Sequence, residues 1–198
     1  MAKSSANTQK QHVDIFRKSL LRKRCKALPG AVYIPFCGDG DLAVAHFDTR
    51  HIYGADIDPA CVLNAQIRLP NADIRIGDCD GWLFPDVKTP FACADFDAYV
   101  NPYKSLIAFW TNAQKRKRIV LFGTDGMRQR IKRAKVVRTL PQGKEFPSPD
   151  WRKCFNFWWT QTVLPFLIDT IRSYKVVEKM FYLRGPSGML YWGIVAEK

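Results

Sequence analysis

A glycine-rich turn is the first place in the chain where residue types and spacing indicate chemistry. A short apolar run with Val32 and Ile34 stops at Gly38 and Gly40, and apolar residues then resume with helical spacing. Glycine adopts backbone conformations that are closed to residues with a Cβ, and it lets a ligand approach the main chain. The pattern predicts a strand, a tight turn and a helix whose N-terminus faces a bound ligand.

Two carboxylates follow the next two apolar runs. Asp56 ends one run, sixteen residues after Gly40, and Asp78 ends the next. In doubly wound folds an acidic residue about 20 residues after the glycine-rich turn accepts both hydroxyls of a ribose. Because such folds bind ligands where parallel strands end, we expect Gly38, Gly40, Asp56 and Asp78 along one edge of a sheet.

These signals together resemble class I S-adenosylmethionine-dependent methyltransferases over residues 31 to 105. Pro35-Phe-Cys-Gly-Asp-Gly40 is similar to the turn of enzymes that methylate amino groups of DNA and RNA. Gly54-Ala-Asp-Ile-Asp58 resembles the ribose-binding strand end of that family, and Gly77-Asp-Cys79 resembles the adenine-binding one. The resemblance implies S-adenosylmethionine as the cofactor. The cofactor-binding residues that it implies are Pro35, Phe36, Cys37, Gly38, Gly40, Asp56, Ile57, Asp78, Cys79 and Asp95.

The fourth motif, within residues 91–103, fits the family in two registers. Asp95-Phe-Asp-Ala-Tyr99 resembles the Asp-x-Asp-Pro-Tyr/Phe segment of guanine-N2 transfer-RNA methyltransferases, whereas Phe96-Asp-Ala-Tyr-Val-Asn-Pro-Tyr103 resembles the corresponding segment of exocyclic-amine methyltransferases. We favour the first register because residues 91–94 make the better buried strand. The resemblance implies that Asp97 or Asn101 accepts a hydrogen bond from the acceptor amine, and that Tyr99 or Tyr103 stacks on the base.

Two positions depart from the family pattern. Ile34 stands where the family usually has an acidic residue, and Ala98 stands where the first register has proline. Asp39 and Asp41 are near enough to replace the missing carboxylate. The departures keep open a noncatalytic module that binds cofactor or nucleic acid without turnover.

Positive charge is segregated along the chain, whose net charge is +13. Residues 1–30 carry eight basic groups and residues 115–144 carry eleven, whereas residues 31–100 hold eleven acidic and four basic groups. Basic flanks attract a polyanion, because each neutralised phosphate releases a counterion. The predicted nucleic-acid-binding residues are Lys115, Arg116, Lys117, Arg118, Arg128, Arg130, Lys132 and Arg133. The alternatives are a solvated basic face without a partner, and a methyltransferase for a small molecule or a protein.

The element pattern predicts an α/β doubly wound fold. We expect a mostly parallel seven-stranded sheet with helices on both faces, whose strands include residues 118–123 and a C-terminal antiparallel hairpin of residues 175–183 and 189–196. A turn is expected at 124–126, and helices from His12, over 105–112 and from 149 to 174 with a break at Pro165. Residues 1–11 are expected to be flexible, and residues 12–198 to form one domain with a basic loop around 124–150.

Several function classes have little support. No apolar run approaches the roughly 20 residues that span a bilayer, and residues 1–30 lack the apolar core of a secretory signal, so we expect a cytoplasmic protein without a membrane partner. The six cysteines show no Cys-x-x-Cys spacing, which argues against a metal site.

Trp82 could pack on the adenine, but a role in the core is favoured.

Overall fold

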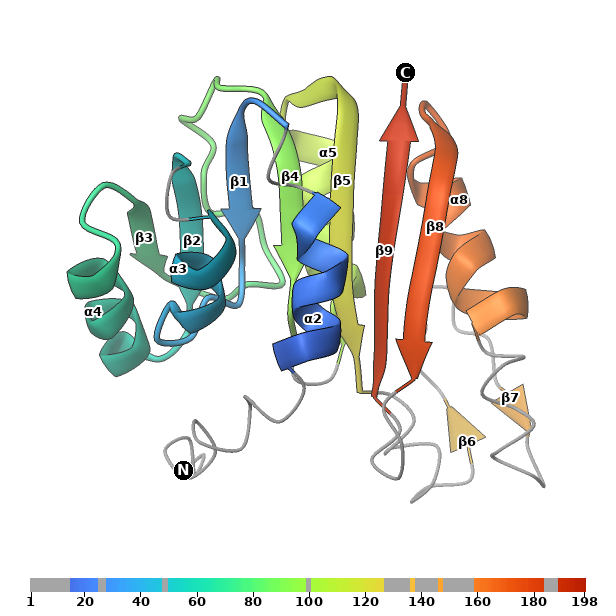
Figure 1. Cartoon of the computed structure of the whole chain (residues 1–198), viewed down its shortest axis with the longest axis horizontal. Helices are drawn as coiled ribbons and strands as arrows, with labels where there is room; N and C mark the ends of the chain where they lie inside the picture. The colour runs from blue at the N-terminus through green and yellow to red at the C-terminus, as the bar shows by residue number, and fades with distance from the viewer. Residues whose placement is uncertain are drawn as a thin grey trace.

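Seven strands form one central sheet in the computed structural model (Figure 1), in the order β3-β2-β1-β4-β5-β9-β8. The structure describes residues 15–24, 28–47, 50–98, 101–126, 136–137, 146–147, 159–183 and 189–198. The strands of the sheet are β1 (Ala31–Ile34), β2 (Ile52–Asp56), β3 (Asp73–Ile76), β4 (Phe91–Phe96), β5 (Lys115–Asp125), β8 (Lys175–Leu183) and β9 (Leu190–Glu197).

The first five strands are parallel, and β9 lies antiparallel between β5 and β8. This arrangement confirms the predicted mostly parallel sheet with a C-terminal antiparallel hairpin. The strand order reverses between β1 and β4, and open α/β sheets bind ligands at such a switch point, outside the carboxyl ends of the strands. We call the side of the sheet where β1 to β5 end the carboxyl edge.

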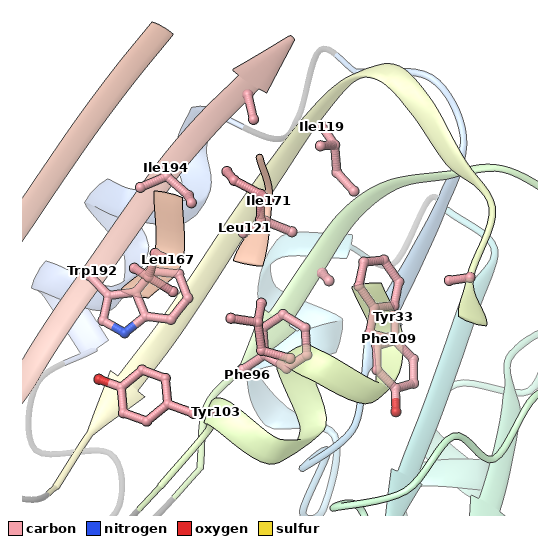
Figure 2. Close-up of a cluster of buried hydrophobic side chains, with 14 of the residues drawn as sticks. Tyr33, Phe96, Tyr103, Phe109, Ile119, Leu121, Leu167, Ile171, Trp192 and Ile194 are labelled. Atoms are coloured by element: carbon pink, nitrogen blue, oxygen red, sulfur yellow. The ribbon is translucent and has the colours of Figure 1, made fainter. Parts of the chain in front are cut away.

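Helices cover both faces of the sheet, as predicted (Figure 1). One buried cluster contains Leu21, Phe47 and Val62, and thus joins three helices to the first face. On the other face, Phe109 and Leu167 belong to a second cluster (Figure 2), in which the Tyr33 ring stacks on Phe109 with centroids 5.2 Å apart. The helices of the first face are α2 (Ile15–Arg22), α3 (Asp41–Phe47) and α4 (Pro59–Arg68), and those of the second are α5 (Tyr103–Asn112) and α8 (Leu164–Thr170).

Local sequence explains two of the elements near the carboxyl edge, the central strand β4 and the start of helix α4. The six residues of β4 are all buried, as expected for a central parallel strand covered on both faces. Helix α4 begins with Pro59, and the Asp58 carboxylate accepts a hydrogen bond from Ala60 N at 2.9 Å. The end of β2 is therefore followed directly by a capped helix start at the carboxyl edge.

Two elements extend beyond their predicted bounds. Strand β5 runs to Asp125 instead of turning at Thr124, because both residues pair with β9, opposite Leu190 and Tyr191. Helix α5 begins at Tyr103, two residues early, because the Asn101 side chain accepts a hydrogen bond from Tyr103 N at 2.9 Å. The first difference arises from pairing between distant strands, and the second from a local hydrogen bond between an asparagine side chain and the backbone two residues later.

Helix α2 buries a narrower apolar stripe than its pattern suggested. Leu21 is buried, but the Phe16 side chain is 72% exposed. The charged side chains of Lys18 and Arg22 occupy the space against the sheet. Trp82 packs against the core, with its ring centroid 5.3 Å from that of Tyr33, which confirms the favoured interpretation.

Little of the long connection before α8 lies within the described residues. Val136–Val137 (β6) pairs antiparallel with Phe146–Pro147 (β7), a small ribbon within the predicted basic loop. A π-helical turn, η3 (Trp159–Val163), leads into α8, whose first turn contains Pro165. This confirms the predicted break, since proline has no N–H for the preceding turn. The predicted helix start at 149 and the N-terminal residues 1–11 lie outside the described residues.

Candidate functional site

The glycine-rich turn lies at the carboxyl edge, between β1 and α3. Gly38 and Gly40 both have left-handed backbone conformations, with φ of +51° and +81°. A Cβ on Gly38 would meet no atom within 4 Å, whereas one on Gly40 would lie 3.3 Å from Leu69 and 3.4 Å from Ala65 of α4. Gly38 therefore faces open space, and Gly40 permits close packing of the turn on α4.

The residues before these glycines anchor the turn in the core. Pro35 and Cys37 are buried, and half-buried Phe36 packs against the cluster of the second face. Burial and the nearby Asp56 carboxylate raise the pKa of the Cys37 thiol well above its usual value, so the thiol stays protonated at neutral pH. Cys37 is thus a packing residue of the turn.

Asp56 connects the turn to the end of β2. Its Oδ2 atom accepts a hydrogen bond from Gly38 N at 3.0 Å, and its Oδ1 atom accepts one from Asp58 N at 3.0 Å. Each carboxylate oxygen keeps a further acceptor site. The next side chain, Ile57, is 70% exposed, which places an apolar surface beside this carboxylate.

The end of β3 lies directly beside the end of β2. Gly77 N donates to Asp56 O at 3.0 Å, so the two strand ends are joined by a main-chain hydrogen bond. Asp78 is exposed and accepts a hydrogen bond from Asp80 N at 3.0 Å, while Cys79 is buried. Burial and the surrounding Asp56, Asp78 and Asp80 carboxylates raise the pKa of Cys79 to about 12. The structure thus brings together the first three predicted motifs.

Asp39 and Asp41 do not face this group. The Asp39 carboxylate accepts a hydrogen bond from Asn64 Nδ2 at 3.1 Å, and Asp41 forms an ion pair with Arg68. Both contacts tie the turn to α4. The suggestion that these carboxylates replace the one missing at Ile34 therefore finds no support in their contacts.

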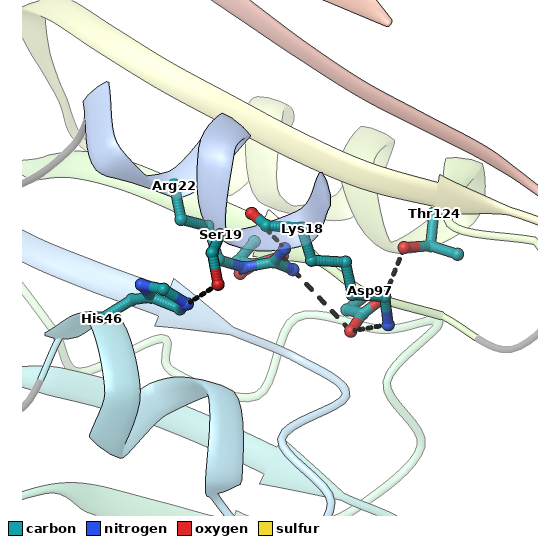
Figure 3. A network of polar contacts seen from close by, with 7 residues as sticks. Lys18, Ser19, Arg22, His46, Asp97 and Thr124 are labelled. Atoms are coloured by element: carbon teal, nitrogen blue, oxygen red, sulfur yellow. Dashed lines mark hydrogen bonds and ion pairs between the residues drawn. The ribbon is translucent and has the colours of Figure 1, made fainter. Parts of the chain in front are cut away.

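Asp95 and Asp97, at the end of β4, are held by two cations of α2. Figure 3 shows the contacts of Asp97. Arg22 donates from Nε to Asp95 Oδ2 at 2.5 Å and from a terminal nitrogen to Asp95 Oδ1 at 2.8 Å. Lys18 Nζ lies 2.7 Å from Asp97 Oδ2, and Thr124 donates its hydroxyl hydrogen to Asp97 Oδ1. Asp95, predicted to bind cofactor, is thus committed to Arg22 inside the protein.

The two carboxylates respond differently to this environment. Burial raises the pKa of Asp95, although the charges of Arg22 and Lys18 oppose it. Burial would also raise the pKa of Asp97, but Lys18, Arg22 and the hydrogen bond from Thr124 outweigh it and hold this pKa below its ordinary value. Asp97 is therefore the ionised hydrogen-bond acceptor that the strand end offers at neutral pH.

The remaining predicted catalytic residues have structural contacts or lie outside the description. Tyr103 is fully buried, donates to Asp125 Oδ2 at 2.5 Å, and packs edge-on against Phe166. No face of its ring is open to a base, which favours a structural role over stacking. Asn101 is half-buried and accepts a hydrogen bond from Tyr103 N at the start of α5, and Tyr99 lies outside the described residues.

The described part of the predicted nucleic-acid-binding set lies away from this site. Lys115, Arg116, Lys117 and Arg118 begin β5 and therefore lie at the opposite edge of the sheet. Lys115 donates to the carbonyl oxygens of Trp110 and Ala113 at the end of α5, both at 2.6 Å, a common use of lysine at a helix C-terminus. The other four predicted nucleic-acid-binding residues lie outside the described residues: Arg128, Arg130, Lys132 and Arg133.

Arg118 is neutralised by carboxylates of the neighbouring strands. One terminal nitrogen lies 2.5 Å from Glu197 Oε1, and the other lies 3.8 Å from Glu178 Oε1. Within this set Arg116 and Lys117 are exposed, and no acidic partner is found for them among the residues that the structure describes.

Comparison with solved structures identifies the fold. A methyltransferase from Mesorhizobium loti that depends on S-adenosylmethionine superposes with a TM-score of 0.58 at 14% identity, over 91% of this chain and 96% of its own. A TehB-like enzyme of Corynebacterium glutamicum with the same cofactor gives 0.53 at 14% identity, over 93% and 89%. A ribosomal RNA methylase of Streptococcus thermophilus gives 0.54 at 12% identity, over 93% and 95%.

The chain has the class I methyltransferase fold. No family model matches the sequence, and no curated protein matches it. The cofactor expected for this methyltransferase fold is S-adenosylmethionine. The residues present fit it, because Gly38 opens onto free space beside an Asp56 carboxylate with acceptor capacity and an exposed apolar side chain at Ile57.

Two further observations concern partners. Among the described residues, no three His, Cys, Asp or Glu side chains are grouped so as to hold a metal ion. Within the same ranges, no helix combines the length and apolar character needed to cross a bilayer.

The sequence prediction missed three residues of the site, Lys18, Arg22 and Thr124. Lys18 and Arg22 were counted among the basic groups of residues 1–30 that attract a polyanion, but both are buried and paired with acidic groups. The signal that could have found them is their four-residue spacing, which places both on one face of a helix. Thr124 has no such signal, because the local sequence predicts a turn at this position.

Proposed function

We propose that this protein is an S-adenosylmethionine-dependent methyltransferase that transfers a methyl group to a nitrogen of a nucleic-acid base. The observation that carries the proposal is the position of Asp97. Its carboxylate is ionised and lies at the end of β4, the strand next to β1 and its glycine-rich turn. An acceptor carboxylate and a nucleoside-binding turn thus share the switch point of the sheet.

The carboxyl edge supplies the contacts that an adenosine group requires. Asp56 already accepts one main-chain hydrogen bond on each oxygen, and its remaining acceptor sites suit the two ribose hydroxyls. Ile57 offers an apolar surface for the adenine ring, and Gly38 leaves room for the methionine part. When bound, S-adenosylmethionine supplies a methyl group on a positively charged sulfur atom.

Asp97 suits an exocyclic amine as the acceptor. The lone pair of such an amine is delocalised into the ring, and a hydrogen bond from the amine to a carboxylate makes that pair more available for attack. The chain otherwise contributes alignment, which can supply a large part of a rate enhancement. A base inside a duplex cannot reach this edge, so the substrate is single-stranded, looped or flipped out.

The nucleic-acid part of the proposal rests on charge. The net charge of +13 and the basic residues after Asp125 favour a polyanionic partner, with Arg116 and Lys117 as further contacts. A ribosomal RNA methylase is among the proteins with this fold. We keep the stacking role of Tyr99 as part of the proposal.

One observation favours a second candidate, a small-molecule methyltransferase. The basic residues nearest Asp97, Lys18 and Arg22, are already neutralised by carboxylates. The described residues at the carboxyl edge therefore do not form a positive surface around the reacting position. A small acceptor would use the same Asp97 and the same cofactor contacts.

The deciding experiment follows labelled methyl groups. The protein is incubated with S-adenosylmethionine carrying a radioactive methyl group and with separate pools of transfer RNA, ribosomal RNA, genomic DNA and small metabolites. Label in one nucleic-acid pool supports the proposal, and label in the metabolite pool alone supports the second candidate. Intact cofactor binding without transfer to any pool contradicts both.

Exchange of Asp97 tests the role of that residue in the same assay. We expect Asp97→Ala to reduce transfer by at least about 100-fold, the scale found for a single group that stabilises a transition state. Affinity for S-adenosylmethionine, measured by calorimetry, should change less than about threefold, because in our assignment Asp97 contacts the acceptor. Asp169→Ala, at an exposed position of α8, is the matched control. Undiminished transfer by Asp97→Ala would remove Asp97 from the reaction.

A further inference from the structure

Helix α2 and the end of strand β4 carry opposite charges that are spaced at similar intervals. Lys18 and Arg22 are four residues apart on the helix, a rise of about 6 Å. Asp97 and Asp95 are two residues apart at the strand end, a distance of about 6.6 Å. The four groups therefore form two successive ion pairs between the helix and the strand, and their charges sum to zero. Figure 3 shows the pair formed by Lys18 and Asp97.

The two pairs differ in their access to water. The Arg22 and Asp95 side chains are each 2% exposed, and two hydrogen bonds join them. The Lys18 and Asp97 side chains are 10% and 11% exposed, and a single hydrogen bond from Nζ joins them. The inner pair is sealed inside the fold, whereas the outer pair keeps some contact with solvent.

From this geometry we propose that Lys18 is a positioning residue of the transfer reaction: with Thr124 it holds the Asp97 carboxylate in the orientation that receives the acceptor amine. This inference rests on the proposed function, because it concerns the same carboxylate. Lys18 occupies Oδ2 and Thr124 occupies Oδ1, so the plane of the carboxylate is fixed by contacts on both oxygens. Acceptor sites on the same oxygens remain for the amine.

Every group that faces Asp97 bears on its protonation. Lys18 and Arg22 approach it from α2, with a terminal nitrogen of Arg22 at 3.7 Å, Asp95 belongs to β4, and the Thr124 hydroxyl comes from β5. On the far side, Lys18 Nζ lies 5.5 Å from the centre of the buried Tyr191 ring of β9. A neighbouring cation within about 4–6 Å lowers the pKa of an aspartate by about one to three units. Loss of Lys18 therefore raises the pKa of Asp97.

The first experiment measures this effect without turnover. The carboxyl carbons of the aspartates, labelled with ¹³C, are titrated by NMR in the wild type, in Lys18→Met and in Lys18→Arg, and Asp97 is assigned from the signal lost in Asp97→Asn. We expect the pKa of Asp97 to rise by about one unit or more in Lys18→Met and to stay near the wild-type value in Lys18→Arg. An Asp97 titration that is the same in all three proteins would overturn the inference.

The second experiment measures kcat against pH with the acceptor found in the labelling assay. Asp97 acts as a carboxylate, so activity is lost as pH falls through its pKa. In Lys18→Met this loss should occur about one pH unit higher, and kcat at neutral pH should fall about tenfold with little change in KM for S-adenosylmethionine. Lys18→Arg should restore the wild-type profile. Lys179→Met, on the exposed side of β8, removes one lysine charge at a distance and should leave kcat unchanged.

Further variants and readouts separate this role from folding. Thr124→Val removes the other contact to Asp97 and leaves α2 unchanged, so it should also raise the pKa of Asp97 and lower kcat. If Lys18 had only a structural role, Lys18→Met would lower the melting temperature but would not shift the pH at which kcat falls. That result would overturn the inference. An inactive wild type whose Asp97 titration shifts in Lys18→Met would contradict the proposed function, and would leave Lys18 as the residue that orients Asp97.

Discussion

Asp56 has two tasks at the carboxyl edge, and they can be separated by substitution. It orders the glycine-rich turn through Gly38 N, and we propose that it also binds the ribose of the cofactor. Asn at this position keeps the size of the side chain and one carbonyl oxygen. It loses the charge and replaces one acceptor oxygen with a donor. The substitution therefore weakens the ribose contacts more than it disturbs the turn.

We expect Asp56→Asn to weaken the binding of S-adenosylmethionine by about 10- to 150-fold. The estimate corresponds to about 1.5–3 kcal/mol for a hydrogen bond to a charged group. Isothermal calorimetry measures the affinity, and a thermal melt checks that the turn still folds. Asp169→Asn, at an exposed position of α8, should bind as the wild type does. Unchanged affinity in Asp56→Asn would place the ribose elsewhere.

The sequence could identify Asp56 but not the roles of the residues around Asp97. The glycine turn and Asp56 are recognisable because their chemistry depends on spacing within a short stretch of chain. The partners of Asp95 and Asp97 lie 73 and 79 residues earlier, and only the packing of α2 on β4 brings them together. Tyr103 illustrates the same limit, because its burial depends on Asp125 and Phe166 from later elements.

At the scale of elements, the Arg22 and Asp95 pair fixes α2 against the sheet. Breaking a buried ion pair at one partner leaves an uncompensated charge, which typically costs about 3–5 kcal/mol. We therefore expect Arg22→Met to lower the free energy of unfolding by about this amount, measured by equilibrium urea denaturation. The comparison is the Arg24 and Glu178 pair, whose Nη1 and Oε2 atoms lie 2.7 Å apart but are exposed to solvent, and Arg24→Met should cost less than about 1 kcal/mol.

A double variant shows whether the cost comes from the unpaired carboxylate. Replacing a buried pair by apolar side chains of similar volume is often neutral or stabilising. Arg22→Met with Asp95→Leu should therefore regain most of the stability lost in Arg22→Met alone. Equal losses in the single and the double variant would mean that packing of the Arg22 stem, and not charge, holds α2 in place.

Strand and helix periods predicted the order of the elements but not all of their ends. The apolar runs around Val32, Ile52 and Ala94 correspond to central strands, where burial on both faces leaves a strong pattern. The end of β5 was missed, because Thr124 and Asp125 are polar and are held in the strand by pairing with β9. Such non-local pairing cannot be read from the composition of a turn.

Across the whole molecule, charge is distributed differently from what the sequence alone suggests. Lys18, Arg22 and Arg118 are neutralised by carboxylates, and Lys115 caps α5. Burial and the charge of Lys198 lower the pKa of Lys115. The sequence counts charges correctly but cannot tell which of them are already satisfied within the fold.

The position of Arg116 and Lys117 leads to a prediction about substrate size. Lys115, at the start of β5, pairs with Phe91, and the six residues of chain from Phe91 to Asp97 span about 20 Å at the usual rise of a strand. When a base lies beside Asp97, a folded RNA is therefore long enough to contact Arg116 and Lys117 as well. A short oligonucleotide is not. We expect Arg116→Gln with Lys117→Gln to weaken the binding of transfer RNA and to leave the binding of a five-nucleotide single strand unchanged.

The salt dependence of binding measures how many contacts with phosphates the double variant loses. Each neutralised phosphate contributes about 0.7 to 0.9 to the slope of log affinity against log salt concentration, so the double variant should reduce the slope for transfer RNA by about 1.4 to 1.8. Lys175→Gln with Lys179→Gln, on the edge strand β8, removes the same charge and serves as the control. An equal change of slope for the short oligonucleotide would mean that the nucleic acid binds along the amino end of β5. No change for either ligand would exclude Arg116 and Lys117 from the interface.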